Sequence, residues 1–319
     1  MKNRIEAIDI AKGLGIILVV FGHLTNTGEW QRILVHSFHM PMFMILSGYC
    51  FHSDSVIHIV VKAAKRYLIF AYVTLAIDIP VSLVFAHQPF PNAWGWLKTF
   101  TLSGGLWRNT PIWFLFTLTL CQILMTLCLK LPKEVRPFVI GAFVLLNILL
   151  TFQIGWWVTA TLSAFPFFAF GCCAASRNAL HNVKKWGGRA SIGLLLLLGI
   201  AALGNGYTDM YSLVSGKSYL VFMFTGILGT LLMLQFAGAI VKFPRFKSVC
   251  LQLGTKTFII LISHYYICRM AVPKLLSLLG MNYLASNIFF QLVATMIIVC
   301  VYLIIFHVCK TWKLKNLHP

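Results

Sequence analysis

Residues 8–27 read IDIAKGLGIILVVFGHLTNT, and this stretch decides the fold class. Most of its residues are apolar or small, and about 20 residues of this kind are enough to cross a bilayer as an α-helix. Three ionisable side chains, Asp9, Lys12 and His23, interrupt the stretch. No small-residue cleavage site follows His23, so we expect a retained membrane helix and not a cleaved secretory signal.

The composition of the whole chain also indicates a membrane protein. Of the 319 residues, 59% are hydrophobic and only 10% are charged, and the mean hydropathy is +0.85. A soluble domain carries about 25% charged residues. The composition therefore excludes a soluble enzyme, a disordered chain and a nucleic-acid-binding protein. The nine cysteines show no disulfide framework, and we interpret those within apolar runs as small buried side chains.

The apolar runs predict an all-α polytopic helix bundle with about ten transmembrane helices. We see no internal repeat and no low-complexity linker, so we expect one domain over residues 1–319 with no fused soluble domain. Gly155 barely separates two of the runs, which form either a hairpin or one broken helix. The runs lie at residues 8–27, 34–52, 67–86, 111–130, 137–153, 156–176, 190–206, 218–241, 255–277 and 284–308.

The distribution of basic residues predicts the orientation of these helices. The chain carries 26 Lys and Arg against 7 Asp and Glu, a formal net charge of +19. With the N-terminus in the cytoplasm, 19 of the 26 fall on the cytoplasmic side and 6 on the outer side, and Lys12 lies within the first helix. Cytoplasmic loops of membrane proteins carry an excess of Lys and Arg. We therefore predict ten spans with both termini in the cytoplasm.

The three ionisable residues of the first helix form a candidate functional site. Asp9 and Lys12 are three residues apart and can pair on one helix face. His23 follows Lys12 by eleven residues, close to three turns, which gives a rise of roughly 16 Å. The three side chains therefore share one stripe, with Lys12 near the cytoplasmic surface and His23 in the outer half. The alternative is a snorkelling Lys12, an Asp9 that helps end the helix and an interfacial His23.

Four more residues are expected near the outer surface or within a span. His39 begins the second helix at a depth similar to that of His23, and His264 lies within the ninth. Arg108 and Trp113 flank the start of the fourth helix. Trp113 is either a member of the aromatic belt or a platform for a sugar, and His264 is either a core histidine or a site residue. His36 and His39 lack further ligands at suitable spacing, so we expect no metal site.

Two further groups are placed on the helices that follow. Lys62, Lys65 and Arg66 precede the third helix on the cytoplasmic side, where they fix topology, contact lipid head groups or bind phosphates. Ser47 and Gly48 in the second helix are small residues, and we interpret them as helix-contact positions.

These residues carry a resemblance to acyltransferase family 3. Residues 8–23 resemble the first helix of the family, which has a basic residue, ten intervening residues and a histidine, and an acidic residue three positions before the basic one. Residues 39–49 (HMPMFMILSGY) resemble its second helix, and residues 65–67 (KRY) resemble its basic pair before the third helix. Later segments resemble landmarks of the fucose 4-O-acetylase-like branch: residues 111–115 (PIWFL), 165–168 (FPFF) with Gly171, and Gly254-Thr255 with His264.

The resemblance implies a multi-pass O-acyltransferase of the plasma (inner) membrane. Such a protein moves an acyl group, commonly acetyl from acetyl-CoA, to a sugar hydroxyl of a cell-surface or lipid-linked glycan. We expect Lys12, Lys65 and Arg66 to hold the phosphates of CoA and Asp9 to order Lys12. His23 is the expected general base, because the pKa of histidine lies near neutral pH. Candidates to orient the acceptor or to stabilise the oxyanion are His39, Arg108, Trp113 and His264.

Two departures from the family pattern and one competing function remain. Lys12 stands where arginine is common in the family, and the proline often found after the basic pair is absent from Leu68 to Tyr72. A covalent acyl-enzyme intermediate is an alternative to direct transfer. The competing function is a proton-coupled transporter or flippase, which in-membrane Asp and His residues suit. Against it, no inverted repeat is apparent, and Asp78 is the one acidic residue expected deep within a span.

Overall fold

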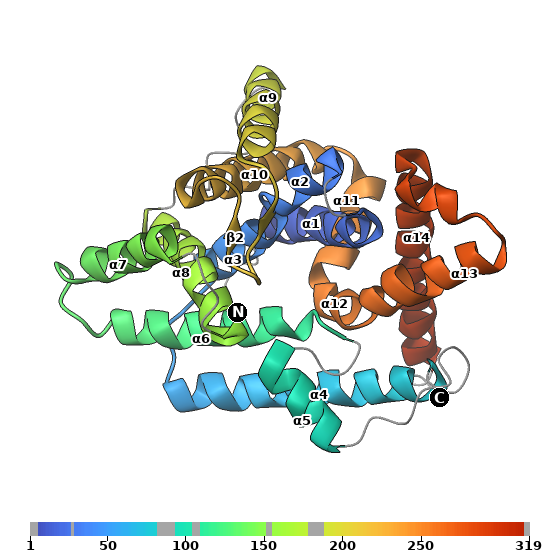
Figure 1. Cartoon of the computed structure of the whole chain (residues 1–319), viewed down its shortest axis with the longest axis horizontal. Helices are drawn as coiled ribbons and strands as arrows, with labels where there is room; N and C mark the ends of the chain where they lie inside the picture. The colour runs from blue at the N-terminus through green and yellow to red at the C-terminus, as the bar shows by residue number, and fades with distance from the viewer. Residues whose placement is uncertain are drawn as a thin grey trace.

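The computed structural model describes residues 6–26, 29–81, 93–103, 109–150, 155–177 and 188–315. Over these ranges the long apolar runs form helices, because a helix satisfies its backbone hydrogen bonds without help from water. The helices (Figure 1) are α1 (Glu6–Leu24), α2 (Trp30–His36), α3 (His39–Tyr49), α4 (Val56–Val81), α5 (Ala93–Ser103), α6 (Ile112–Cys128), α7 (Arg136–Leu149), α8 (Trp156–Ser176), α9 (Gly188–Asn205), α10 (Tyr219–Ile240), α11 (Pro244–Thr255), α12 (Thr257–Tyr266), the π-helix η3 (Ile267–Ala271), α13 (Val272–Leu278), the 3-10 helix η4 (Asn282–Ser286) and α14 (Ile288–Lys315).

The only strands among the described residues are two short antiparallel ones between α9 and α10. β1 (Thr208–Asp209) pairs with β2 (Val214–Ser215), with Thr208 opposite Ser215.

The helices confirm an all-α membrane protein. Among the described residues, five helical stretches are long and apolar enough to cross a membrane. Three shorter apolar helices accompany them: Ile112–Cys128, Arg136–Leu149 and Ala190–Asn205. Ten spans, with both termini in the cytoplasm, stay a prediction. The five long stretches are Glu6–Leu24, Trp156–Ser176, Tyr219–Ile240, Thr257–Leu278 and Ile288–Thr311.

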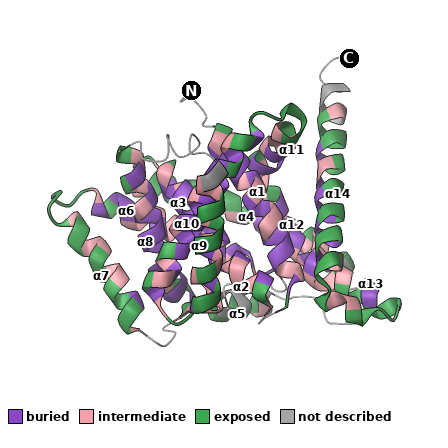
Figure 2. Ribbon diagram, turned by 90° about the horizontal axis from the view of Figure 1, so that it is seen from above, coloured by how far each residue is buried: buried purple, intermediate pink, exposed green. Residues whose placement is uncertain are grey.

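The core lies around α1, α3, α8 and α10. In the most apolar 18 residues of α1, α8 and α10, 67%, 72% and 61% are buried, against 33% in residues 257–278 and in α14. Figure 2 shows the same contrast, with exposed residues along α7, α9 and α14. The exposed side chains of α14 are largely apolar, such as Met296, Ile297 and Ile304. In a membrane protein such a face suits contact with lipid.

Two pairs of glycines let helix backbones touch inside this core. A Cβ on Gly48 of α3 would overlap the carbonyl oxygen of Phe168 in α8, and a Cβ on Gly171 would overlap that of Ile45. In the same way, Gly13 of α1 lies against Cys250 of α11, and Gly254 lies against Asp9. Small residues at helix contacts are typical of membrane bundles. The packing role predicted for Gly48 therefore fits its position.

The second predicted helix is wrong as one continuous span. Residues 34–52 form α2 and α3, which are separated at Ser37 and Phe38. The Ser37 hydroxyl donates a hydrogen bond of 2.7 Å to the carbonyl of Leu34, and the Ser37 carbonyl accepts one of 3.1 Å from Thr225 of α10. These bonds satisfy polar groups at the break, which apolar periodicity does not report.

The third predicted helix also differs from the structure, whereas the ninth agrees with it. Helix α4 begins at Val56, so the basic residues 62, 65 and 66 lie within it and do not precede it. Residues 255–277 correspond to the continuous helical stretch Thr257–Leu278, which α12, η3 and α13 form together. Residues 137–153 and 156–176 correspond to two separate helices, α7 and α8, which lie side by side. Helix α5 lies outside all ten predicted runs.

Candidate active site

One face of α1 lines two cavities. Lys12, Ile16 and Val19 line the first, and Val19 and His23 line the second. The spacings between these residues are four, three and four, which is the period of one helix face. The predicted stripe from Lys12 to His23 is therefore the shared wall of both cavities.

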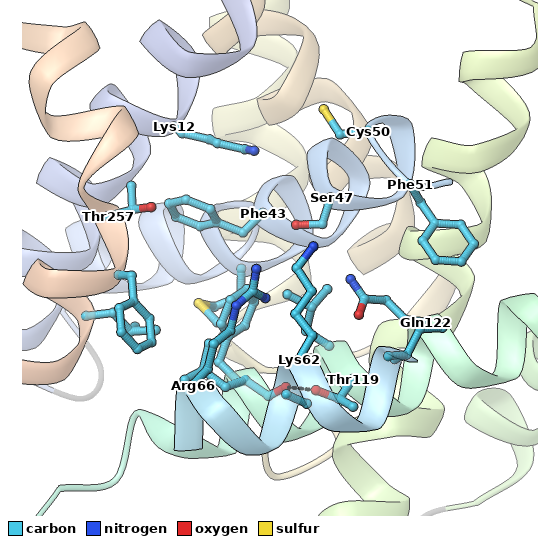
Figure 3. A pocket seen from close by; sticks show the side chains of 18 of the residues that line it. Lys12, Phe43, Ser47, Cys50, Phe51, Lys62, Arg66, Thr119, Gln122 and Thr257 are labelled. Atoms are coloured by element: carbon cyan, nitrogen blue, oxygen red, sulfur yellow. Dashed lines mark hydrogen bonds between the residues drawn. The ribbon is translucent and has the colours of Figure 1, made fainter. Parts of the chain in front are cut away.

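The first cavity, which we call the basic cavity, has a volume of about 540 Å³. Lys12 extends into it from α1, and Lys62 and Arg66 extend into it from α4 (Figure 3). Lys62 and Arg66 are exposed, so the cavity reaches the surface of the protein on their side. Its other polar side chains include Ser47 of α3, Gln122 of α6 and Thr257 of α12.

Two residues predicted for this region lie elsewhere. Lys65 does not line the basic cavity, whereas Lys62 does, because residues 62 and 66 are four apart and share a helix face. Asp9 is 8% exposed and lines neither cavity. The pairing of the Asp9 and Lys12 side chains stays a prediction. The backbone of Asp9 packs against Gly254.

The second cavity, which we call the histidine cavity, has a volume of about 520 Å³ and is lined by four histidines. The ring centroids of His23 and His264 are 5.0 Å apart, and those of His36 and His39 are 4.8 Å apart. Trp113 also lines it. Sequence analysis proposed His23, His39, Trp113 and His264 separately, and the fold brings them together. Arg108, the remaining candidate, lies outside the described residues.

Hydrogen bonds fix the proton position on two of these histidines. The Nδ1 atom of His264 lies 2.8 Å from the carbonyl oxygen of Ile260, and the Nδ1 atom of His39 lies 2.8 Å from that of Val35. A carbonyl only accepts, so Nδ1 carries the proton in both rings and Nε2 keeps a free lone pair. The Nε2 atom of His264 is buried and has no hydrogen-bond partner among the described residues. It is therefore available to accept a hydrogen bond from a ligand.

An asparagine that sequence analysis did not single out holds α12 at the site. The Asn109 amide, just before α6, donates hydrogen bonds of 2.8 Å to the Ile262 carbonyl and 3.2 Å to the Thr74 hydroxyl of α4. Because Asn109 is fully buried, these bonds are shielded from water. They fix the turn of α12 that carries His264.

The two cavities meet at four apolar side chains, Val19, Met40, Phe114 and Leu261, which line both. We call this set the neck. It is contributed by α1, α3, α6 and α12, so four helices converge where the basic cavity gives way to the histidine cavity. A ligand long enough to pass the neck would contact both cavities at once.

Sequence analysis missed several residues of the histidine cavity. Arg32, Tyr207, Asp209, Tyr211 and Arg269 line it as well. They come from α2, the β1–β2 region and η3, which are far apart in the sequence, so no local spacing connects them. Among the described residues, no group of three or more His, Cys, Asp or Glu side chains is arranged to hold a metal ion.

The sequence profile of an acyltransferase domain matches residues 5–307. The chain belongs to acyltransferase family 3. Comparison with curated proteins gives no match, and comparison with solved structures gives none.

For an acyltransferase of family 3, two adjoining cavities match the need to bind two substrates. The enzyme must hold an acyl donor and an acceptor with the reacting atoms in contact. A basic cavity and a histidine cavity that share the neck provide two adjoining compartments on one helix face. Membership of the family and the apolar helices establish a membrane acyltransferase.

Proposed function

We propose that the protein is an O-acyltransferase of the plasma (inner) membrane that crosses it several times. It transfers an acyl group, acetyl by default, from cytosolic acyl-CoA to a sugar hydroxyl of a cell-surface or lipid-linked glycan. The fucose 4-O-acetylase-like branch is the part of the family that we favour, on the landmarks quoted above. The observation that carries this proposal is the single face of α1 that joins Lys12 to His23 along both cavities.

The basic cavity is proposed to bind the CoA part of the donor. CoA is a cytosolic polyanion, and on the predicted topology Lys12, Lys62 and Arg66 lie at the cytoplasmic side. Arg66 can bind a phosphate through two parallel N–H bonds, whereas the two lysines act as point charges. The acyl-pantetheine arm then passes the neck, over the rise of roughly 16 Å between Lys12 and His23.

The histidine cavity is proposed to hold the acceptor and perform the transfer. His23 takes the proton of the acceptor hydroxyl, whose oxygen attacks the thioester carbonyl carbon. The new C–O bond forms, the C–S bond breaks, and His23 returns the proton to the CoA sulfur. Because Nε2 of His264 and of His39 accept and do not donate, we assign these two residues to bind acceptor hydroxyls and not the oxyanion. The indole of Trp113 offers a face for stacking against the sugar.

The test follows acetyl-CoA turnover by the purified protein in lipid nanodiscs, with and without cell-envelope glycan. Free CoA is measured by chromatography, because the exposed thiols of Cys50, Cys173, Cys300 and Cys309 would react with a colorimetric thiol reagent. Glycan-stimulated CoA release supports the proposal. A folded protein that releases no CoA from any acyl-CoA would contradict it and favour the transporter, which proton-coupled uptake into vesicles would then examine.

The donor site makes a separate prediction about KM. We expect Lys12→Gln and Arg66→Gln each to raise KM for acetyl-CoA about tenfold or more, because each removes a charge-assisted contact to phosphate. Lys65→Gln should stay within about twofold, since Lys65 does not line the basic cavity. Initial rates over a range of acetyl-CoA concentrations measure this. An equal effect of Lys65→Gln and Arg66→Gln would mean that general surface charge, and not the cavity, binds the donor.

A further inference from the structure

The histidine cavity contains two arginines whose charge nothing in the proposed transfer explains. Arg32 projects from α2 and Arg269 from η3, and both line this cavity. Two like charges in one partly buried cavity repel each other, and the repulsion is stronger than in water because the surroundings are less polar. A negative charge, supplied by the protein or by a ligand, would offset this repulsion.

The protein supplies little compensation for these two arginines. Arg32 donates hydrogen bonds of 2.9 Å to the Thr25 carbonyl and 3.4 Å to the Tyr207 hydroxyl, both of which are neutral groups. The guanidinium of Arg269 has no hydrogen-bond partner and no ion pair among the described residues. Arg269 is therefore a half-buried cation with unused donors at the cavity wall.

Asp209 is the one acidic residue that lines the cavity among the described residues. Its carboxylate oxygens accept hydrogen bonds of 3.1 Å from the Tyr211 N–H and 3.1 Å from the Ser212 hydroxyl. It forms no ion pair within 4 Å with Arg32 or Arg269. Burial raises the pKa of the Asp209 carboxyl above its usual value. One acid against two arginines leaves the cavity with a net positive charge.

A short π-helix brings Arg269 to the wall of the histidine cavity. Arg269 lies within the π-helix η3, five residues after His264. At 3.6 residues per turn, a regular α-helix would turn residue 269 about 140° away from residue 264. The π-helix instead forms i→i+5 hydrogen bonds and takes in an extra residue, and such segments occur frequently at functional sites. Both His264 and Arg269 therefore line the same cavity.

We infer that the histidine cavity selects an acceptor that carries an anionic group, a carboxylate or a phosphate, bound by Arg269 and Arg32. The inference rests on the proposed function and specifies its acceptor class. Guanidinium groups match the planar, two-oxygen geometry of carboxylate and phosphate. The acceptor places its anionic group against the arginines while its hydroxyls contact the histidines. The anion is either the carboxylate of an acidic sugar or the phosphate that links a sugar to a lipid.

Binding is tested first, by ligand-observed NMR on the full protein in nanodiscs of zwitterionic lipid. Two matched pairs of probes separate the two sources of the anion. Methyl β-D-glucuronide and methyl β-D-glucoside differ only in a carboxylate, and citronellyl phosphate and citronellol differ only in a phosphate. We expect one charged probe to bind about tenfold or more tightly than its neutral partner. Preference for the first pair identifies an acidic sugar, and preference for the second identifies a lipid-linked phosphate.

Four variants decide whether the arginines cause that preference. Arg269→Gln and Arg32→Gln should each reduce the ratio of affinities to within about threefold of unity, whereas Arg269→Lys should keep part of it. Arg269 makes no hydrogen bond within the described protein, so Arg269→Gln should fold even if Arg32→Gln does not. The matched control is Lys274→Gln, which removes an exposed cation five residues further on, outside the cavity, and should keep the full ratio.

The outcomes separate this inference from the proposed function. Equal binding of charged and neutral probes by the wild type overturns the inference, as does a preference that survives in both Arg→Gln variants. Acetyl-CoA turnover on the same preparations is a separate measurement. An arginine-dependent preference without CoA release supports the anion site and contradicts the proposed transfer from acyl-CoA. CoA release without the preference supports that transfer and contradicts the anion site.

Discussion

Exchange of His23 for glutamine is expected to lower kcat for acyl transfer by about 10²–10⁴-fold, the range that general base catalysis supplies. Glutamine is similar in size but does not take a proton at neutral pH. The KM for acetyl-CoA should stay within about threefold, because the charged groups proposed to bind CoA lie at the other end of the α1 face. Steady-state rates with a saturating glycan acceptor measure both constants. His23→Ala should abolish transfer while expression is retained.

Two further histidine variants sharpen this result. His307→Gln on α14 alters an exposed histidine outside both cavities and should leave kcat unchanged. His264→Gln should lower kcat less than His23→Gln, since its role is to bind the acceptor. The reverse order would reassign the base to His264, whose free Nε2 already has the lone pair that a base requires.

The second large effect concerns folding and not chemistry. Gly171→Leu is expected to abolish the folded protein, because a Cβ at this position overlaps the Ile45 carbonyl oxygen of α3. The clash lies between two backbones, so no side-chain rotation relieves it. Gly171→Ala should already lower stability by about 1–3 kcal/mol, the usual cost of overpacking. Yield and size-exclusion profile in detergent measure the first variant, and thermal unfolding measures the second.

A glycine of a peripheral helix gives the matched control. A Cβ on Gly141 of α7 has nothing within 4 Å, so Gly141→Leu should be tolerated. Glycine within a helix lowers stability by about 0.5–1 kcal/mol relative to alanine. Gly141→Leu should therefore leave the stability unchanged or raise it slightly. Equal loss of folded protein for Gly171→Leu and Gly141→Leu would show that helix α3 does not contact α8 as closely as described.

The sequence alone predicted the helical membrane class and one wall of the site. Both follow from local signals: apolar runs long enough for a bilayer, and charged or polar residues at the period of a helix face. Lys12 and His23 lie on the same helix, so their common stripe needed no knowledge of the tertiary fold. The sequence did not distinguish Lys65 from its neighbour Arg66. The two residues lie on different sides of α4, and only Arg66 lines the basic cavity.

The residues that line the histidine cavity from other helices could not be predicted from the sequence. Arg32, Tyr207 and Arg269 meet only because α2, the β1–β2 region and η3 pack around one cavity. The π-helix at residues 267–271 depends on packing and hydrogen bonding that a hydropathy pattern does not record. For the same reason the break between α2 and α3 was invisible, since Ser37 reads as one small polar residue within an apolar run.

The apolar side chains of the neck bear on whether protons can leak through the protein. On the predicted topology, the two cavities approach each other from opposite sides of the membrane, and a continuous water column between them would conduct protons. Val19, Met40, Phe114 and Leu261 offer water no hydrogen bonds, and hydrophobic constrictions of this kind close channels by dewetting. We expect these four side chains to exclude such a water column while, on the proposed function, the acyl group passes between the two cavities.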